Sequence, residues 1–152
     1  MTEKRPTITI LLAEDDEDQF LLAKDALAET GLEIDVRWVR DGEELMNYLQ
    51  RRSPYHDDVV APWPRLILLD LNMPKKDGRE ALSEIKADPR FRAIPVVVLT
   101  TSRNDEDIHY TYSLGGSFIR KPVRFDQIVE VLGNLAKYWL ETVEPPPRNH
   151  DT

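Results

Sequence analysis

Residues 66–78 read LILLDLNMPKKDG, and this stretch decides the fold class. Four consecutive apolar residues lead directly into Asp70, and the turn formers Pro74 and Gly78 follow within one short loop. A continuous apolar run indicates a strand buried on both faces of a parallel sheet, because a half-exposed strand alternates apolar and polar residues. The acid that ends this strand therefore lies at the edge where open α/β sheets bind their ligands.

Four further apolar runs rich in β-branched residues occur along the chain, and stretches with the 3- and 4-residue spacing of a helix separate them. We predict strands at residues 8–13, 34–39, 66–69, 94–100 and 117–119. Strand and helix alternate five times. This order predicts an α/β fold, a doubly wound, five-stranded parallel sheet in a flavodoxin-like three-layer sandwich.

Helix-boundary residues support this division. Asp41 followed by Glu44 predicts the start of the second helix, and Asp88 before Pro89 predicts the end of the third. Residues 1–140 are expected to form one domain. Residues 141–152, ETVEPPPRNHDT, read as a Pro-rich tail that is too short to build a second core, so no separate output domain is expected.

Composition excludes several classes of protein. The 152 residues include 20 Lys and Arg against 28 Asp and Glu, a net charge of −8 that disfavours a nucleic-acid partner. Cysteine is absent, which excludes a disulfide framework, a thiolate nucleophile and a Cys-ligated metal. No apolar run approaches the roughly 18 residues of a membrane span, and the N-terminus lacks a signal-peptide cleavage site. We expect a cytoplasmic protein without a membrane partner.

Polar side chains follow the predicted strands at the points where the strands end. They are Glu14, Asp15 and Asp16 after the first strand, Asp70 after the third, Thr100 at the end of the fourth, and Lys121 after the fifth. These ends meet at one edge of the sheet, so we expect an acidic pocket flanked by a hydroxyl and an ammonium. Oxygen ligands without His or Cys suit Mg²⁺, and an Asp carboxylate can act as a nucleophile in phosphoryl transfer.

Other interpretations of these residues remain open at this point. Any one acid after a strand can be a helix N-cap, and we favour that role for Asp16. A phosphatase of the haloacid-dehalogenase type would carry its nucleophilic Asp on the first strand and would need a cap domain. A flavin binder would need a phosphate loop rich in Ser, Thr and Gly after the first strand, where this chain has EDDEDQ. Both are disfavoured.

The segments LLAEDD, LILLDLNMPKKDG, IPVVVLTTS and FIRKP, in this order, resemble the chemotaxis-regulator-like receiver domain of two-component response regulators. The resemblance spans about residues 7–140. It implies that Asp70 is the phosphoacceptor for a sensor histidine kinase and that the protein is not an enzyme acting on other substrates. Because the acidic, hydroxyl and lysine positions are all present, a degenerate receiver that is never phosphorylated is disfavoured.

The same resemblance assigns roles to the other site residues. Asp15 would ligate Mg²⁺ directly, Glu14 through water and Asn72 through its backbone carbonyl, together with Asp70. Thr100 and Lys121 would contact phosphoryl oxygens, and Phe118 would be the switch aromatic that moves with Thr100. Lys121–Pro122 would be a cis peptide. Thr101 departs from the small residue that is usual after the switch Thr, so its role and that of Asp16 are left open.

Three further segments, AEDDEDQFLLAKDAL, LTTSRNDEDI and YWLETVEPP, resemble the single-domain response regulators of bacterial and cyanobacterial phytochromes. This implies a phytochrome histidine kinase as phosphodonor and a homodimer formed through the face from the fourth strand to the fifth helix and the C-terminal extension. The expected dimer residues are Val131, Tyr138, Trp139 and Leu140. Phosphorylation would switch partner or dimer interactions. The alternative is a phosphate shuttle or sink in a phosphorelay with a non-phytochrome kinase.

Overall fold

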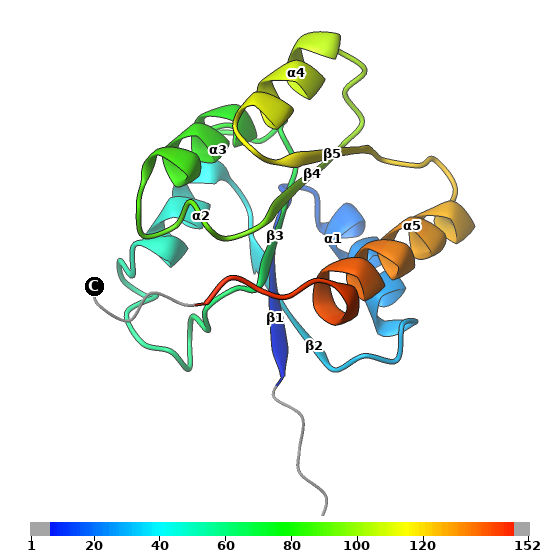
Figure 1. The fold of residues 1–152 in the computed structure, drawn as a ribbon, viewed down its shortest axis with the longest axis horizontal. Helices are drawn as coiled ribbons and strands as arrows, with labels where there is room; N and C mark the ends of the chain where they lie inside the picture. Colours follow the sequence, from blue (N-terminus) through cyan, green and yellow to red (C-terminus); the bar gives the residue numbers. More distant parts are fainter. Residues whose placement is uncertain (1–6, 148–152) are drawn as a thin grey trace, which may run out of the picture.

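The computed structural model describes residues 7–147, which form one five-stranded parallel sheet with helices on both faces (Figure 1). The strands are β1 (Ile8–Ala13), β2 (Ile34–Val39), β3 (Leu66–Leu69), β4 (Val96–Thr100) and β5 (Ser117–Arg120). Their order in the sheet is β2-β1-β3-β4-β5. The predicted doubly wound fold is confirmed, and the switch point of the strand order lies between β1 and β3.

The helices are α1 (Glu17–Ala28), α2 (Gly42–Leu49), α3 (Gly78–Ala87), α4 (Asp105–Ser113) and α5 (Phe125–Lys137), and a π-helical turn η1 (Tyr138–Thr142) continues α5. One buried cluster packs α1 and α5 against one face of the sheet. A second cluster packs α2 and α3 against the other face, and Tyr110 and Leu114 from the α4 region contact it. These two clusters are the buried interfaces between the sheet and the two helix layers of the three-layer sandwich.

The predicted helix boundaries agree with the observed caps. The Asp41 side chain accepts a hydrogen bond from the backbone N–H of Glu44 at the start of α2, and α3 ends at its C-cap, Asp88, before Pro89. The fourth strand begins at Val96 rather than at residue 94. Pro95 lacks the N–H that a ladder residue donates, which explains the later start.

The tail beyond α5 remains partly a prediction. Residues 148–152 lie outside the described residues, so the prediction of a tail over 141–152 without an output domain stays a prediction. Within the described part, Arg65 Nη2 donates to the carbonyl of Leu140 at 3.2 Å and fixes the chain after α5 beside β3.

No helix within residues 7–147 has the length and apolar composition needed to cross a membrane.

Candidate functional site

Backbone hydrogen bonds continue past the strand ends and hold the predicted site residues at one edge of the sheet. Glu14 donates to the carbonyl of Val39 at 3.0 Å, and Asp70 donates to the carbonyl of Ala13 at 3.0 Å. Lys121 donates to the carbonyl of Thr100 at 2.7 Å. The parallel ladder therefore aligns residues from β1, β3, β4 and β5 that lie far apart in the sequence.

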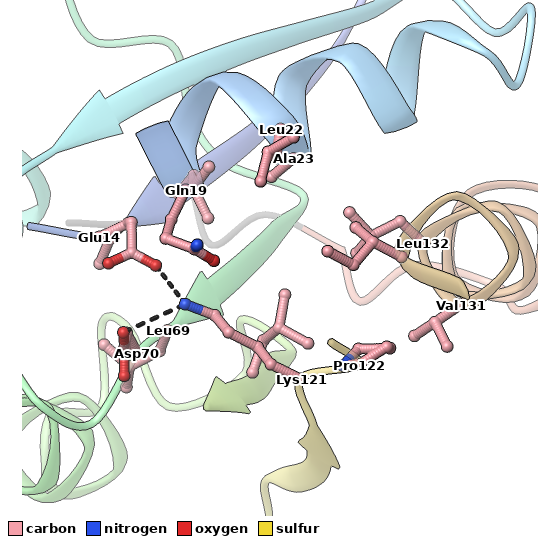
Figure 2. A pocket seen from close by; sticks show the side chains of 14 residues that line it. Glu14, Gln19, Leu22, Ala23, Leu69, Asp70, Lys121, Pro122, Val131 and Leu132 are labelled. Atoms are coloured by element: carbon pink, nitrogen blue, oxygen red, sulfur yellow. Dashed lines mark hydrogen bonds and ion pairs between the residues drawn. The ribbon is translucent and has the colours of Figure 1, made fainter. Parts of the chain in front are cut away.

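One ammonium group lies between two carboxylates at this edge. Lys121 Nζ forms an ion pair with Glu14 Oε1 and lies 3.3 Å from Asp70 Oδ2 (Figure 2). The side chains of Lys121, Glu14 and Asp70 are 11%, 5% and 12% exposed. Because these groups are largely shielded from water, the two carboxylates would repel each other strongly without a cation between them.

The pKa values of Glu14 and Lys121 are both raised, but burial and charge oppose each other on each group. Burial raises the pKa of Glu14 to about 7, although the neighbouring Lys121 ammonium favours its charged form. Burial also lowers the pKa of Lys121, but the charges of Asp70 and Glu14 outweigh it and raise the pKa above its ordinary value. Lys121 is therefore a permanent positive charge in the site at neutral pH.

The carboxylates of Glu14, Asp15 and Asp70 fit a divalent metal ion. Their oxygens lie within 4.8 Å of one another, and Asp15 is exposed so that an ion can reach it from solvent. A donor set made only of oxygen suits a hard cation such as Mg²⁺ or Mn²⁺. The backbone N–H of Asn72 donates to Asp70 Oδ1 at 3.1 Å, which places Asn72 beside this cluster.

The remaining predicted residues lie around this cluster. Thr100 is fully buried at the end of β4, and Phe118 on β5 is half-buried against the core on the α2 and α3 face. Asp16 accepts a hydrogen bond from the backbone N–H of Gln19 at 3.2 Å, which confirms that it caps α1. Thr101 is exposed at the start of the loop after β4.

Comparison with known proteins agrees with this geometry. The family model of the response regulator receiver domain matches residues 10–133. This chain belongs to that family. It is 39% identical over 145 residues to the response regulator Rcp1 of Synechocystis sp., an alignment that covers 95% of this chain and 97% of Rcp1.

Two solved structures are similar over nearly the whole receiver domain. The phosphorylated cyanobacterial phytochrome response regulator RcpA has a TM-score of 0.87 at 42% identity and covers 93% of this chain and 100% of its own. The Mn²⁺-bound form of Rcp1 has a TM-score of 0.84 at 39% identity and covers 92% of this chain and 99% of its own. The chain is thus a response regulator receiver, a signalling protein homologous to phytochrome response regulators.

Two of our residue assignments in this receiver domain are wrong. The cis peptide within residues 7–147 is Ser53–Pro54, and the Lys121–Pro122 bond is trans. The backbone of Lys121 is fixed by its hydrogen bond to Thr100, and from there the side chain reaches Glu14 and Asp70 without a cis bond.

Leu140 does not belong to an exposed dimer face, because it is only 6% exposed and packs into the core between α1 and α5. Leu140 follows the buried Leu132 and Ala136 at four-residue steps, so it continues the buried face of α5 into the π-helical turn. Of the other predicted dimer residues, Tyr138 is 52% exposed. Trp139 is half-buried and packs edge-on against the ring of Tyr138 at 5.2 Å, and Val131 lines a cavity between α1 and α5 beside the site (Figure 2).

Trp38 supports the acidic loop, and sequence reasoning missed it. Its indole N–H donates to the backbone carbonyl of Glu14 at 2.6 Å. The Trp38 ring stacks on Phe20 of α1, with centroids 4.3 Å apart and planes 3° from parallel. The Arg40 guanidinium lies over the Trp38 ring, 4.4 Å from its centroid. The only sequence signal was a tryptophan near the end of an edge strand.

Trp38→Phe is expected to weaken Mg²⁺ binding by about tenfold, the lower end of the usual cost of losing a group that orients a metal ligand. The substitution keeps a ring on Phe20 but removes the donor to Glu14. Titration calorimetry with Mg²⁺ measures the effect. Phe20→Leu is the control, since it removes the stack and keeps the donor. Wild-type affinity in Trp38→Phe would rule out the supporting role.

Proposed function

We propose that this receiver accepts a phosphoryl group on Asp70 from the histidine of a sensor kinase, in a reaction that requires Mg²⁺. The observation that carries the proposal is the contact of Lys121 with both Glu14 and Asp70 beside the exposed Asp15. This arrangement combines a nucleophilic carboxylate, a fixed cation and a set of metal ligands at one edge of the sheet. Phosphoryl transfer depends mainly on such positioning and charge neutralisation.

In the proposed reaction, an Asp70 oxygen bonds to phosphorus while the bond from phosphorus to the donor nitrogen breaks, which leaves an acyl phosphate. Lys121 and Thr100 are assigned to the phosphoryl oxygens, and Phe118 is assigned to follow Thr100 when the domain switches. Asp15, Asp70, Glu14 through water and the carbonyl of Asn72 are assigned to Mg²⁺, which supplies positive charge for the transferred group. The phosphorylated RcpA and Mn²⁺-bound Rcp1 structures support these assignments by homology.

The homology also supports a phytochrome histidine kinase as the phosphodonor, acting on this chain in the cytoplasm. In this role the receiver catalyses only its own phosphorylation and dephosphorylation. We further propose a homodimer through the face from β4 to α5 and the C-terminal extension, where Tyr138 is 52% exposed and Val131 and Trp139 are half-buried. Sedimentation of the wild-type chain tests the dimer, and a monomer at every concentration would contradict it.

Removal of divalent metal is expected to abolish phosphorylation. The wild-type protein is incubated with acetyl phosphate and either Mg²⁺ or excess EDTA, and its intact mass is measured. A single phosphoryl addition that requires Mg²⁺ and maps to the peptide containing Asp70 supports the proposal. Equal incorporation in EDTA would contradict the metal requirement, and absence of incorporation under both conditions would contradict the phosphoacceptor role.

A further inference from the structure

A buried carboxylate outside the acidic cluster connects three segments of the receiver. Asp107, in the first turn of α4, is 5% exposed. Its Oδ1 accepts from Arg79 Nε at 2.6 Å, and its Oδ2 accepts from Arg79 Nη2 at 2.6 Å and from Ser102 Oγ at 2.7 Å. We call these three residues the Arg79–Asp107–Ser102 clamp.

On one side, the clamp reaches the switch residue. The backbone N–H of Ser102 points to Thr100 Oγ1 at 3.4 Å, and the backbone N–H of Asn104 donates to Ser102 Oγ at 3.2 Å. The Asn104 side chain in turn accepts from the backbone N–H of Glu106 at 2.9 Å and caps α4. Side chains thus tie the loop of residues 101–104 to both Thr100 and α4.

On the other side, the clamp reaches the phosphoacceptor loop. Arg79 is the second residue of α3, and its carbonyl accepts from the hydroxyl of Tyr110 on α4 at 3.0 Å. The preceding Gly78 packs so closely that a Cβ there would lie 2.2 Å from the carbonyl oxygen of Asp70. The backbone N–H of Gly78 also donates to the carbonyl of Leu71 at 2.9 Å, so the start of α3 is packed and hydrogen-bonded against the loop that follows Asp70.

Charge makes the clamp strong. The Arg79 side chain holds the pKa of Asp107 below its usual range, with a smaller contribution from the Ser102 hydroxyl, and Asp107 raises the pKa of Arg79. Both groups stay ionised at neutral pH. The carboxylate end of this pair is buried, whereas the Arg79 side chain is 34% exposed. A forked guanidinium–carboxylate contact is among the stronger and more directional polar contacts in proteins.

We propose that Asp107, held by Arg79, is a positioning residue that fixes Ser102 and the loop of residues 101–104 and thereby slows loss of the phosphoryl group from Asp70. This inference rests on the proposed phosphoacceptor function. In the loss step, a water oxygen bonds to phosphorus and the bond from phosphorus to the Asp70 oxygen breaks. The products are inorganic phosphate and the Asp70 carboxylate. A fixed loop beside Thr100 limits the ways in which water can reach the acyl phosphate.

Ser102→Ala tests the clamp with little effect on the fold, because it removes one hydroxyl and keeps the Arg79–Asp107 ion pair. The full chain is phosphorylated with acetyl phosphate and Mg²⁺, the donor is removed, and the half-life of the phosphorylated mass is followed. We expect the half-life to shorten about fivefold, the rate change that corresponds to one hydrogen bond of ordinary strength. Asp107→Asn disrupts the contact with Arg79 as well and is expected to shorten the half-life at least as much.

Ser113→Ala is the matched control. Its hydroxyl, at the last residue of α4, also donates one hydrogen bond, to the backbone carbonyl of Tyr110 at 2.7 Å, but it is outside the clamp. A shorter half-life in Ser102→Ala and Asp107→Asn but not in Ser113→Ala supports the proposal. A wild-type half-life in both clamp variants overturns it, as does an equal shortening in Ser113→Ala.

Amide hydrogen exchange in the unphosphorylated protein gives a second readout that does not depend on the phosphoacceptor function. Ser102→Ala is expected to speed exchange at the Asn104 amide, which loses its acceptor, while melting temperature stays near that of the wild type. Unchanged exchange at Asn104 would overturn the claim that the clamp fixes the loop. Failure of the wild type to take up a phosphoryl group would instead overturn the proposed function, and with it the effect on phosphoryl lifetime.

Discussion

Asp70→Asn is expected to reduce phosphoryl incorporation from acetyl phosphate by at least about 100-fold, because a neutral amide cannot act as the nucleophile. The substitution nearly preserves the size of the side chain. One of its terminal atoms can still accept from the backbone N–H of Asn72, so the loop after β3 keeps its main local contact. Intact mass after incubation with Mg²⁺ and donor measures the loss.

Asp16→Asn is the matched control for this experiment. It makes the same chemical change in the same acidic region, but Asp16 caps α1 and does not belong to the carboxylate cluster. We expect it to incorporate phosphate as the wild type does. Incorporation at the wild-type level in Asp70→Asn would show that another group is the acceptor, and circular dichroism of both variants checks that the fold is intact.

Lys121→Met is expected to destabilise the metal-free protein by about 3 kcal/mol, the usual cost of removing one partner from a buried ion pair. The substitution leaves the poorly exposed Glu14 and Asp70 carboxylates without the cation between them. Urea denaturation in EDTA measures the change. Addition of Mg²⁺ is expected to recover part of the loss, because a bound divalent cation neutralises the same carboxylates.

The loss in Lys121→Met is expected to depend on pH. Burial raises the pKa of Glu14 from 4.5 to about 7 in the wild type, and Lys121 opposes this rise. A carboxyl whose pKa is higher in the folded state contributes stability that is present at low pH and is lost as pH rises through that pKa. Without Lys121 the pKa of Glu14 rises further, so the difference from the wild type should be larger at pH 8 than at pH 5.

Lys76→Met provides the control for charge removal alone. Lys76 pairs with Glu84, and their side chains are 26% and 44% exposed, so this pair is expected to contribute at most about 1 kcal/mol. A comparable loss of stability in Lys76→Met and Lys121→Met would contradict the argument. So would a loss in Lys121→Met that stays the same from pH 5 to pH 8.

The sequence was sufficient to predict the strands and the edge of the sheet that carries the site. Strands buried on both faces are continuous apolar runs, and the bounds of β1, β2 and β3 match those predicted. The ladder of a parallel sheet then aligns the strand ends, so Glu14, Asp70 and Lys121 meet as expected. These features depend on local patterns and on one general rule of topology.

Other features depend on contacts between residues far apart in the sequence, which no local pattern predicts. Trp38 meets the carbonyl of Glu14 across 24 positions of sequence, and Arg79 meets Asp107 across 28. The burial of Leu140 could have been predicted, because it continues the four-residue row of the buried Leu132 and Ala136. The roles of Thr100, Phe118 and Asn72 come from family resemblance and remain predictions.

The stacked indole of Trp38 at the end of β2 is an intrinsic fluorophore next to the acidic loop. Of its three tryptophans, Trp63 lines a cavity with Pro95, which precedes β4, and Trp139 lies in the turn after α5. Trp38 is hydrogen-bonded to the loop that carries the Glu14 and Asp15 carboxylates. A change in the acidic loop is therefore expected to alter the Trp38 contribution to the intrinsic fluorescence of the native chain, without an attached dye.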